Sequence, residues 1–337
     1  MATNGDDTIE VVPVRHAGRW VGSAVALLFI AMLVHTLFSK VPTGQRACHV
    51  VNGIKTCHPI VAWRFGWNVV FHYFGASEIL RGLVITLELT VLSMLIGIVL
   101  GIFLAIMRLS HSRLLSGAAW SYTWFFRGTP VYVQLLFWGY FAILYPVLTI
   151  GLPFLHVTFL HLDANSVFSP FRAAMVALGL NEAAYMSEIA RSGLISVDEG
   201  QIEAATSLGM THAQTLRLVI LPQAMRVIIP PTGNEVISML KTTSLAVVVS
   251  LTELLGAAAN IYGSNYQIMP LLIVASLWYL IATTILSIGQ FYVERHFAKG
   301  ALRTPPPTPM QRLSEDLKGI GSKFRTRRGA SESGVRP

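Results

Sequence analysis

A short polar segment inside a long apolar stretch holds the residues of this chain that could do chemistry. Residues 224–259 are almost continuously hydrophobic, yet positions 234–244 carry an amide, a carboxylate, an amine and several hydroxyls. Two adjacent helix faces would carry them: Asn234, Ser238 and Lys241 on one, Glu235 and Thr242 on the other, with Thr243 and Ser244 following. Polar groups at membrane depth are costly and either line a cavity or pair with each other. The segment therefore predicts either the lining of a cavity or path, or a packing surface for neighbouring helices.

Enzymatic chemistry is not indicated anywhere in the sequence. A phosphate-binding G-x-x-x-x-G-K-[ST] loop is absent, and so is the dipeptide Gly-Lys. The ten His residues are scattered, without H-E-x-x-H, and no G-x-S-x-G occurs. We expect no catalytic residue, no metal site and no cofactor in this chain.

The composition is that of a membrane protein. The 337 residues are 53% hydrophobic and 12% charged, with mean hydropathy +0.58, whereas roughly 25% of residues are charged in soluble proteins. The net charge of +8 comes from basic residues in loops and the C-terminal tail, without an aromatic-interleaved face, so we expect no nucleic-acid partner. The fold class predicted is an all-α membrane protein with about six transmembrane helices.

Hydropathy divides the chain into an N-terminal span, a linker, a core and a tail. We expect a cytoplasmic N-terminus at 1–19, an added span at 20–38, an external linker at 39–78, a core at 79–298 and a disordered basic tail at 299–337. A cleaved signal peptide is the alternative for 20–38, but Ser39-Lys40-Val41-Pro42 is a poor cleavage site. In the core, spans are expected at 83–107, 128–150, 170–190, 224–259 and 269–293, the fourth broken near Lys241–Ser244. Because the tail is basic, both termini should be cytoplasmic, where it could also contact membrane lipid.

Small residues form a stripe on the helix expected at 83–107. Their spacing of three or four places them on one face, and they are Thr86, Thr90, Ser93, Gly97 and Gly101. A small-residue stripe lets helix backbones approach closely in membranes. We expect this face to pack against another helix.

The linker contains a hairpin signal. Asn52-Gly53 is flanked by apolar residues, and counting outward from it places Cys48 opposite Cys57. Such a pair is close enough for a disulfide, which we predict. Free thiols are one alternative. A zinc site that adds His49 and His58 is another, although adjacent strand residues point to opposite faces.

A polar segment, Asn181–Pro222, interrupts the apolar core. Ser196 with Glu199, and Thr211 with Gln214, are spaced as capping boxes and predict two short helices. Gly209 should permit the turn between them with positive φ, and Pro222 should limit the second helix. We call this helix–glycine–helix segment, residues 198–212, the elbow. A polar elbow between membrane spans is suited to docking a cytoplasmic partner.

At these residues the chain resembles a known family. Glu203-Ala204-Ala205, Gly209 and Leu221-Pro222 are similar to the EAA loop of permeases of ATP-binding-cassette (ABC) importers. Further motifs resemble the polar amino-acid branch: Phe126-Arg127-Gly128-Thr129-Pro130, Ala184-Tyr185 with Glu188-Ile189 and Arg191, Pro230-Pro231 with Gly233-Asn234, and Lys241-Thr242-Thr243-Ser244-Leu245. Thr242 departs from the acidic or amide residue often found there.

The resemblance implies an assembly and a function. The chain would be an inner-membrane permease subunit with a five-helix core and an ATPase-coupling loop at 191–222, and it would form the path for a polar amino acid. Its partners would be cytoplasmic ATPase subunits that hold the ATP and Mg²⁺, a second permease (itself or a sister) and an external solute-binding protein. The alternative is a self-sufficient secondary transporter or channel. That class predicts paired broken segments in an inverted repeat, and the 234–244 pattern has no second copy.

Overall fold

A computed structural model describes residues 17–51, 54–152 and 157–297. The expectations for the tail at 299–337, and for nearly all of the segment at 1–19, lie outside the described residues. The chain forms two compact units, one from residues 1–79 with 258–274 and one from residues 80–257 with 275–337. Each unit is described by itself.

The smaller unit holds the N-terminal helix and a hairpin. Its elements are α1 (Ala17–Leu37), β1 (Lys40–Val51), β2 (Ile54–Trp63) and α2 (Trp67–Phe74). The Trp67 indole donates to the Leu37 carbonyl over 2.9 Å and stacks on Phe38 with ring centroids 5.2 Å apart. These contacts fix the end of α1 to the start of α2.

The expected hairpin register is confirmed in the backbone. Strands β1 and β2 are antiparallel, with Val51 opposite Ile54 and Cys48 opposite Cys57. The side chains of both cysteines lie outside the described residues, so the disulfide stays a prediction.

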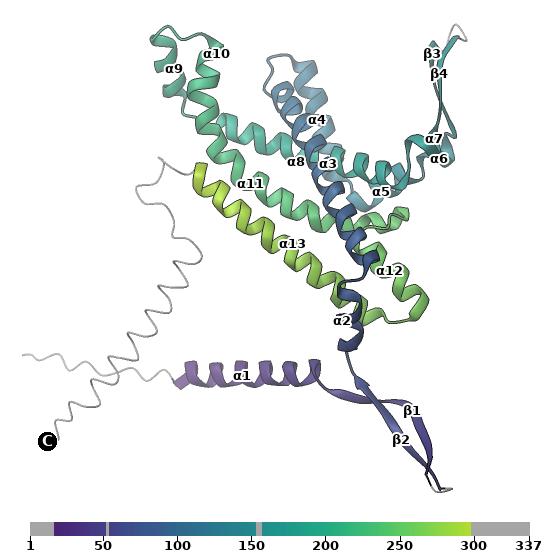
Figure 1. Ribbon diagram of the computed structural model, residues 1–337. Helices are drawn as coiled ribbons and strands as arrows, with labels where there is room; N and C mark the ends of the chain where they lie inside the picture. The colour runs from purple at the N-terminus through teal and green to yellow at the C-terminus, as the bar shows by residue number, and fades with distance from the viewer. Residues whose placement is uncertain (1–16, 52–53, 153–156, 298–337) are drawn as a thin grey trace, which may run out of the picture. The chain divides into compact units, whose positions relative to one another are not determined.

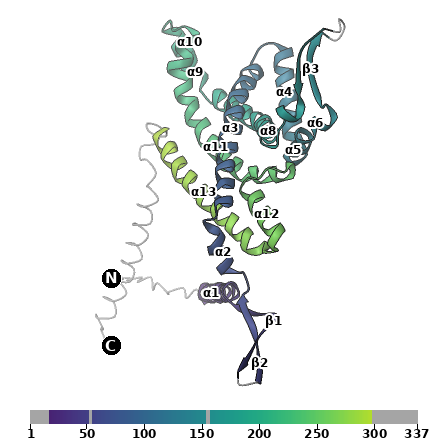
Figure 2. The same ribbon diagram turned by 45° about the vertical axis from the view of Figure 1, so that its right-hand side comes forward.

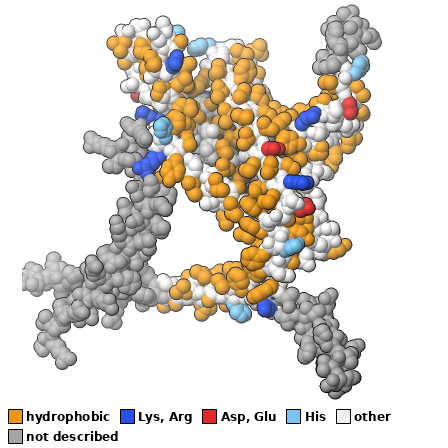
Figure 3. Space-filling view, viewed as in Figure 1, with side chains coloured by type: hydrophobic (Ala, Val, Ile, Leu, Met, Phe, Trp, Pro, Cys, Tyr) orange, Lys and Arg blue, Asp and Glu red, His pale blue; other side chains and the backbone are white. Residues whose placement is uncertain are grey.

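The larger unit is built around α8 (Pro170–Ile195), which packs against α4 (Arg113–Gly128), α5 (Val131–Gly139) and α11 (Leu221–Thr242). Small side chains make this central position possible, because alanines 173, 174, 177, 183, 184 and 190 are all buried. The unit also contains the greater part of α3 (Ser77–Arg108) and of α13 (Ile268–Phe297) (Figure 1). The outer surface is largely hydrophobic on the face seen in Figure 3.

The small-residue stripe of α3 packs against other helices, as the sequence predicts: Gly97 and Gly101 meet α8, and Thr86 meets the start of α12 (Leu254–Asn265). Thr86, Thr90 and Ser93 are buried. A Cβ atom added at Gly97 would lie 2.5 Å from Cγ of Glu182, and one at Gly101 would lie 2.5 Å from Cβ of Met186. Only glycine permits this approach of the two backbones.

The span predicted at 128–150 is wrong. Residues 113–128, between this and the preceding predicted span, form the helix α4, and α5 then ends after nine residues at Gly139. The short α6 (Phe141–Leu144) leads into a hairpin of β3 (Val147–Leu152) and β4 (Val157–Asp163), visible in Figure 2. Thr129 is extended because Pro130 follows it, which separates α4 from α5.

The elbow contains α9 (Glu199–Ser207), a turn, and the start of α10 (His212–Thr215). The capping box of Thr211 with Gln214 is confirmed. The one expected at Ser196 is wrong, because Asp198 caps α9 by accepting from Gly200 N. Gly209 has the expected positive φ of 77°, and two backbone bonds, Gly209 N to Thr206 O and Met210 N to Ala205 O, close the end of α9.

Pro222 does not limit the second helix of the elbow, contrary to expectation. α10 runs through a π-helical turn, η1 (Leu216–Ile220), directly into α11, as both ribbon views show (Figures 1 and 2). The Leu221 N–H donates to the Leu216 carbonyl, five residues back. This wider turn accommodates the proline, which has no N–H and whose ring crowds the preceding turn. The elbow and α11 are therefore mechanically continuous.

α11 gives way to the 3₁₀ helix η2 (Thr243–Val249) beside the expected break, and Ser250 follows with φ 60°. The chain resumes as α12 (Leu254–Asn265), bent by 45°. Within the described residues, α3 and α13 are long and apolar enough to cross a membrane, and the bent pair adds a third crossing if it is one span. A shorter apolar helix covers Val21–Leu37. The number of six spans stays a prediction.

The α3–α8 seam leads to a stability prediction. Gly101→Ala should lower the free energy of unfolding by about 1–3 kcal/mol, because the new methyl group meets backbone atoms of Met186 and Ser187 at 3.0 Å. Gly117→Ala is the matched control, since nothing lies within 4 Å of its added Cβ, and it should stabilise by up to about 1 kcal/mol. Thermal unfolding of the purified protein in detergent measures both, and equal effects of the two substitutions would contradict the close packing.

Candidate functional site

A cavity of about 580 Å³ opens among α4, α5, α8 and α11 of the larger unit. Its polar lining comes from the α4–α5 junction, from α8 and from α11: Arg127, Thr129, Asn181, Glu182, Tyr185, Glu235, Ser238 and Thr242. Leu178, Met239 and Val131 supply apolar walls. Polar groups from three parts of the unit therefore converge on one concavity, which makes it a candidate ligand site.

Two amides hold the α4–α5 junction in place. The Gln134 side-chain amide donates to the carbonyls of Phe126 and Thr129 and to the Thr129 hydroxyl, over 2.7–3.1 Å. Asn181 of α8 donates to the Phe126 carbonyl over 2.9 Å and to Gln134 Oε1 over 3.2 Å. These bonds satisfy carbonyls that the helix break leaves without partners, and they fix Arg127 at the mouth of the cavity.

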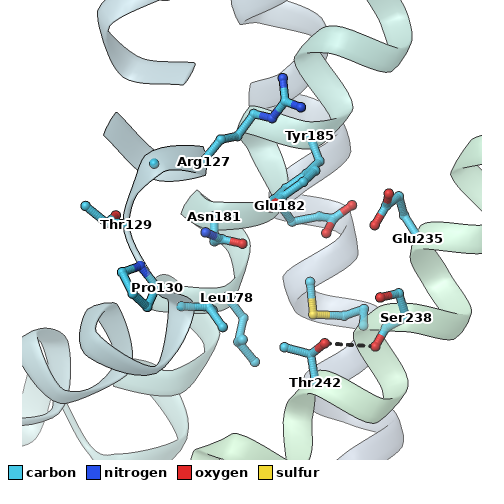
Figure 4. Close-up of a pocket in the computed structure, with 13 residues that line it drawn as sticks. Arg127, Thr129, Pro130, Leu178, Asn181, Glu182, Tyr185, Glu235, Ser238 and Thr242 are labelled. Carbon is cyan, nitrogen blue, oxygen red and sulfur yellow. Dashed lines mark hydrogen bonds between the residues drawn. The ribbon is translucent and has the colours of Figure 1, made fainter. Parts of the chain in front are cut away.

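The cavity is lined by two acidic side chains and one basic side chain. Glu182 on α8 and Glu235 on α11 direct their carboxyl groups toward each other across the cavity, while Arg127 extends from the α4 end (Figure 4). Glu182 is buried, and its Oε1 has no hydrogen-bond partner among the described residues. A buried acceptor without a partner costs free energy, which a donor entering the cavity would recover.

The structure separates the polar residues predicted at 234–244. Glu235, Ser238 and Thr242 line the cavity, so Ser238 shares its environment with Glu235 and Thr242 and not with Asn234 and Lys241. Asn234 accepts from Gln290 of α13 over 3.0 Å. Thr243 is buried and donates to the Leu240 carbonyl.

Lys241 and Ser244 belong to another cavity, of about 380 Å³, which they share with α13. The physical reason is the position of α8, which approaches α11 from the side of Glu235 and not from that of Lys241. Some of the polar residues at 234–244 therefore line the cavity beside α8, and others face α13.

Five polar residues of the cavity were not among the candidate site residues from the sequence: Arg127, Thr129, Asn181, Glu182 and Tyr185. Of these, Glu182 could have been identified from the sequence, because a carboxylate inside an apolar helix should face the interior of the helix bundle. Arg127 had no such signal, because it lies between two predicted spans, and only the structure shows it in the last turn of α4.

The elbow residues are mostly exposed to solvent. Glu203 and Ala204 are exposed, whereas Ala205 is buried and holds α9 against the chain. Leu208, next to the turn at Gly209, exposes 83% of its surface at the tip of the elbow. Leu221 and Pro222 lie at the start of α11 and not in a loop.

The family described as binding-protein-dependent transport system inner membrane component matches residues 97–299. The chain belongs to this family. It is a multi-pass inner-membrane permease subunit and not an enzyme. A crystal structure of an amino acid ABC transporter with histidines superposes with TM-score 0.55 at 36% identity, covering 65% of this chain and 94% of that one.

Curated relatives carry names of amino-acid permeases. The arginine transport system permease protein ArgU of Corynebacterium glutamicum is 44% identical over 88% of this chain and 85% of its own. HisM of Escherichia coli, a histidine/lysine/arginine/ornithine permease, is 38% identical over 61% of this chain and 82% of its own. The match to ArgU covers 88% of this chain, which is more than residues 54–337 contain. The similarity therefore includes β2 and reaches into β1.

The amide clamp leads to a prediction for the cavity mouth. Gln134→Leu should raise the hydrogen–deuterium exchange of residues 126–133 by about tenfold or more, because it removes the donor shared by three oxygen atoms. Gln201→Leu, on the exposed face of α9, is the control and should leave that exchange unchanged. Unaltered exchange in Gln134→Leu would show that the clamp does not hold the junction.

Proposed function

We propose that the chain is the permease subunit of an ABC importer for cationic amino acids, and that the cavity between α8 and α11 is its translocation site. The single observation that carries the substrate class is the pair Glu182 and Glu235, with the unpartnered Oε1 of Glu182 (Figure 4). An ammonium or guanidinium group would donate the hydrogen bond that Glu182 Oε1 lacks and would pair with the charge of Glu235. Arg127 at the other end suits the α-carboxylate, and the names of ArgU and HisM support the same class.

The elbow is the proposed docking element for a cytoplasmic ATPase subunit, which would hold the ATP and Mg²⁺. Its exposed Leu208 suits an apolar pocket in that partner, and Glu203 suits a polar rim. Because α10 continues through η1 into α11, a displacement of the elbow would reach Glu235 along one helix. This continuity supports coupling of ATP hydrolysis to the cavity.

The remaining parts of the assembly follow from the same proposal. A second permease, itself or a sister, and an external solute-binding protein would complete the importer, with both termini of this chain in the cytoplasm. The hairpin β1–β2 would then lie outside the cell, where an oxidising environment favours a Cys48–Cys57 disulfide. Cavity residues Ser238 and Thr242 would offer hydroxyls to the passing substrate.

The substrate class is tested by uptake into vesicles that contain the complex purified with its co-eluting ATPase. ATP-dependent uptake should favour arginine and lysine over glutamine and glutamate. Glu235→Gln should lower arginine uptake by about tenfold and affect glutamine uptake less, because it removes a charge that only the cationic side chain needs. Glu88→Gln, exposed on α3, is the control.

Uptake without any nucleotide-hydrolysing partner would contradict this function and favour a secondary transporter. Equal loss of arginine and glutamine uptake in Glu235→Gln would be consistent with an importer. It would refute the proposal that this carboxylate determines the substrate class.

The docking element is tested separately. Leu208→Ser and Gly209→Arg should each reduce co-purification of the ATPase by at least about tenfold, the first by removing the apolar anchor and the second by straining the turn at φ 77°. Leu114→Ser, at a leucine 82% exposed on α4, is the matched control and should retain the partner. Full ATPase recovery with both elbow variants would place docking elsewhere.

A further inference from the structure

Glu253 is a fully buried carboxylate whose hydrogen bonds come from three helices. Its Oε2 accepts from the Tyr279 hydroxyl of α13 over 2.8 Å, from the Thr86 hydroxyl of α3 over 3.3 Å and from Leu255 N over 2.9 Å. Its Oε1 accepts from Gly256 N over 2.8 Å. Burying a charge is expensive, and these four donors offset the cost only while the three helices keep their positions.

The backbones also meet at this point. Thr86 Oγ1 accepts from Leu254 N over 3.1 Å, so Thr86 bonds both the carboxylate and the backbone of the first turn of α12. One turn earlier on α3, a Cβ added at Gly82 would lie 2.9 Å from the Glu253 carbonyl oxygen and 2.9 Å from Cβ of Ala257. α3 therefore lies directly against the start of α12, an approach that only glycine at position 82 permits.

The Glu253 contact lies immediately beyond the break that follows the cavity. η2 (Thr243–Val249) and Ser250, with φ 60°, separate it from α11. α13 is bonded to both sides of the break. Gln290 donates to the carbonyl of Pro230 and to Asn234 Oδ1 on α11, while Tyr279 donates to Glu253. Along α13 these two bonds are about 16 Å apart at 1.5 Å per residue.

We propose that Glu253 is a positioning residue of the transport cycle, the fulcrum about which α11 and α13 turn against α3 when the elbow moves. The hydrogen bonds from Thr86 and Tyr279 to Glu253 are kept throughout this motion. The irregular segment 243–250 takes up the change in angle between α11 and α12. Met239 and Thr242 of the cavity wall lie just before that segment, so rotation about the fulcrum changes the cavity. Glu253 lines no part of that cavity and does not touch the substrate; the inference rests on the proposed importer function.

The test compares Glu253→Gln with wild type in the complete, ATPase-loaded complex. An amide has one acceptor atom and one donor group, so it cannot accept all four bonds. Assembly and ATP hydrolysis should stay within about twofold of wild type, while arginine uptake per ATP hydrolysed falls at least about tenfold. Tyr279→Phe removes one hydroxyl and should lower the same ratio by about threefold. Glu88→Gln on α3 and Tyr292→Phe on α13, both exposed, are the matched controls.

Each other outcome overturns the fulcrum. If hydrolysis and uptake fall in proportion, or if neither changes, Glu253 does not couple them. If the Glu253→Gln complex fails to assemble, Tyr279→Phe provides the test, because it preserves the aromatic ring. An unchanged ratio of arginine uptake to ATP hydrolysis in that variant refutes the proposal. A wild-type complex without ATP-dependent uptake would instead refute the proposed function, and the fulcrum with it.

Discussion

A polar group enclosed by apolar helices must have a hydrogen-bond partner, and the larger unit is arranged around that constraint. Gln134 and Asn181 supply donors to the carbonyls at the α4–α5 junction, and Thr86 and Tyr279 supply them to Glu253. Three buried side-chain atoms of the described residues have no hydrogen-bond partner: Arg108 Nε, Glu182 Oε1 and Ser187 Oγ. Of these residues, Glu182 lines the cavity, where a ligand could supply the missing hydrogen bond.

Irregular helix geometry has a mechanical consequence. The π-turn η1 keeps the elbow and α11 on one helical path despite Pro222, whereas the 3₁₀ segment η2 interrupts that path just after the cavity. In the proposed transport cycle, the continuous helix would carry a displacement of the elbow to the cavity wall, and the irregular segment after the cavity would absorb the bend.

The sequence predicted local features well wherever the cause is local. Gly209 in the turn, the Thr211–Gln214 capping box and the pairing of Cys48 with Cys57 each depend on a few neighbouring residues. One local prediction failed, because Ser196 lost the capping role to Asp198 two residues later. The other failure is α4, whose packing partner α8 lies far along the chain and meets it at the buried Ala119 and Thr123.

By itself, the sequence determined that the chain is a helical membrane protein with a polar elbow, because hydropathy and residue spacing are local properties. The permease class came from the resemblance of its motifs to a known family. Only the tertiary structure decided which polar residues share a cavity. Ser238 and Lys241 are three residues apart on one helix, yet they line different cavities, because α8 packs on one side of α11 and α13 on the other. Helical periodicity fixes the angle between two side chains, and it carries no information about which neighbour occupies each direction.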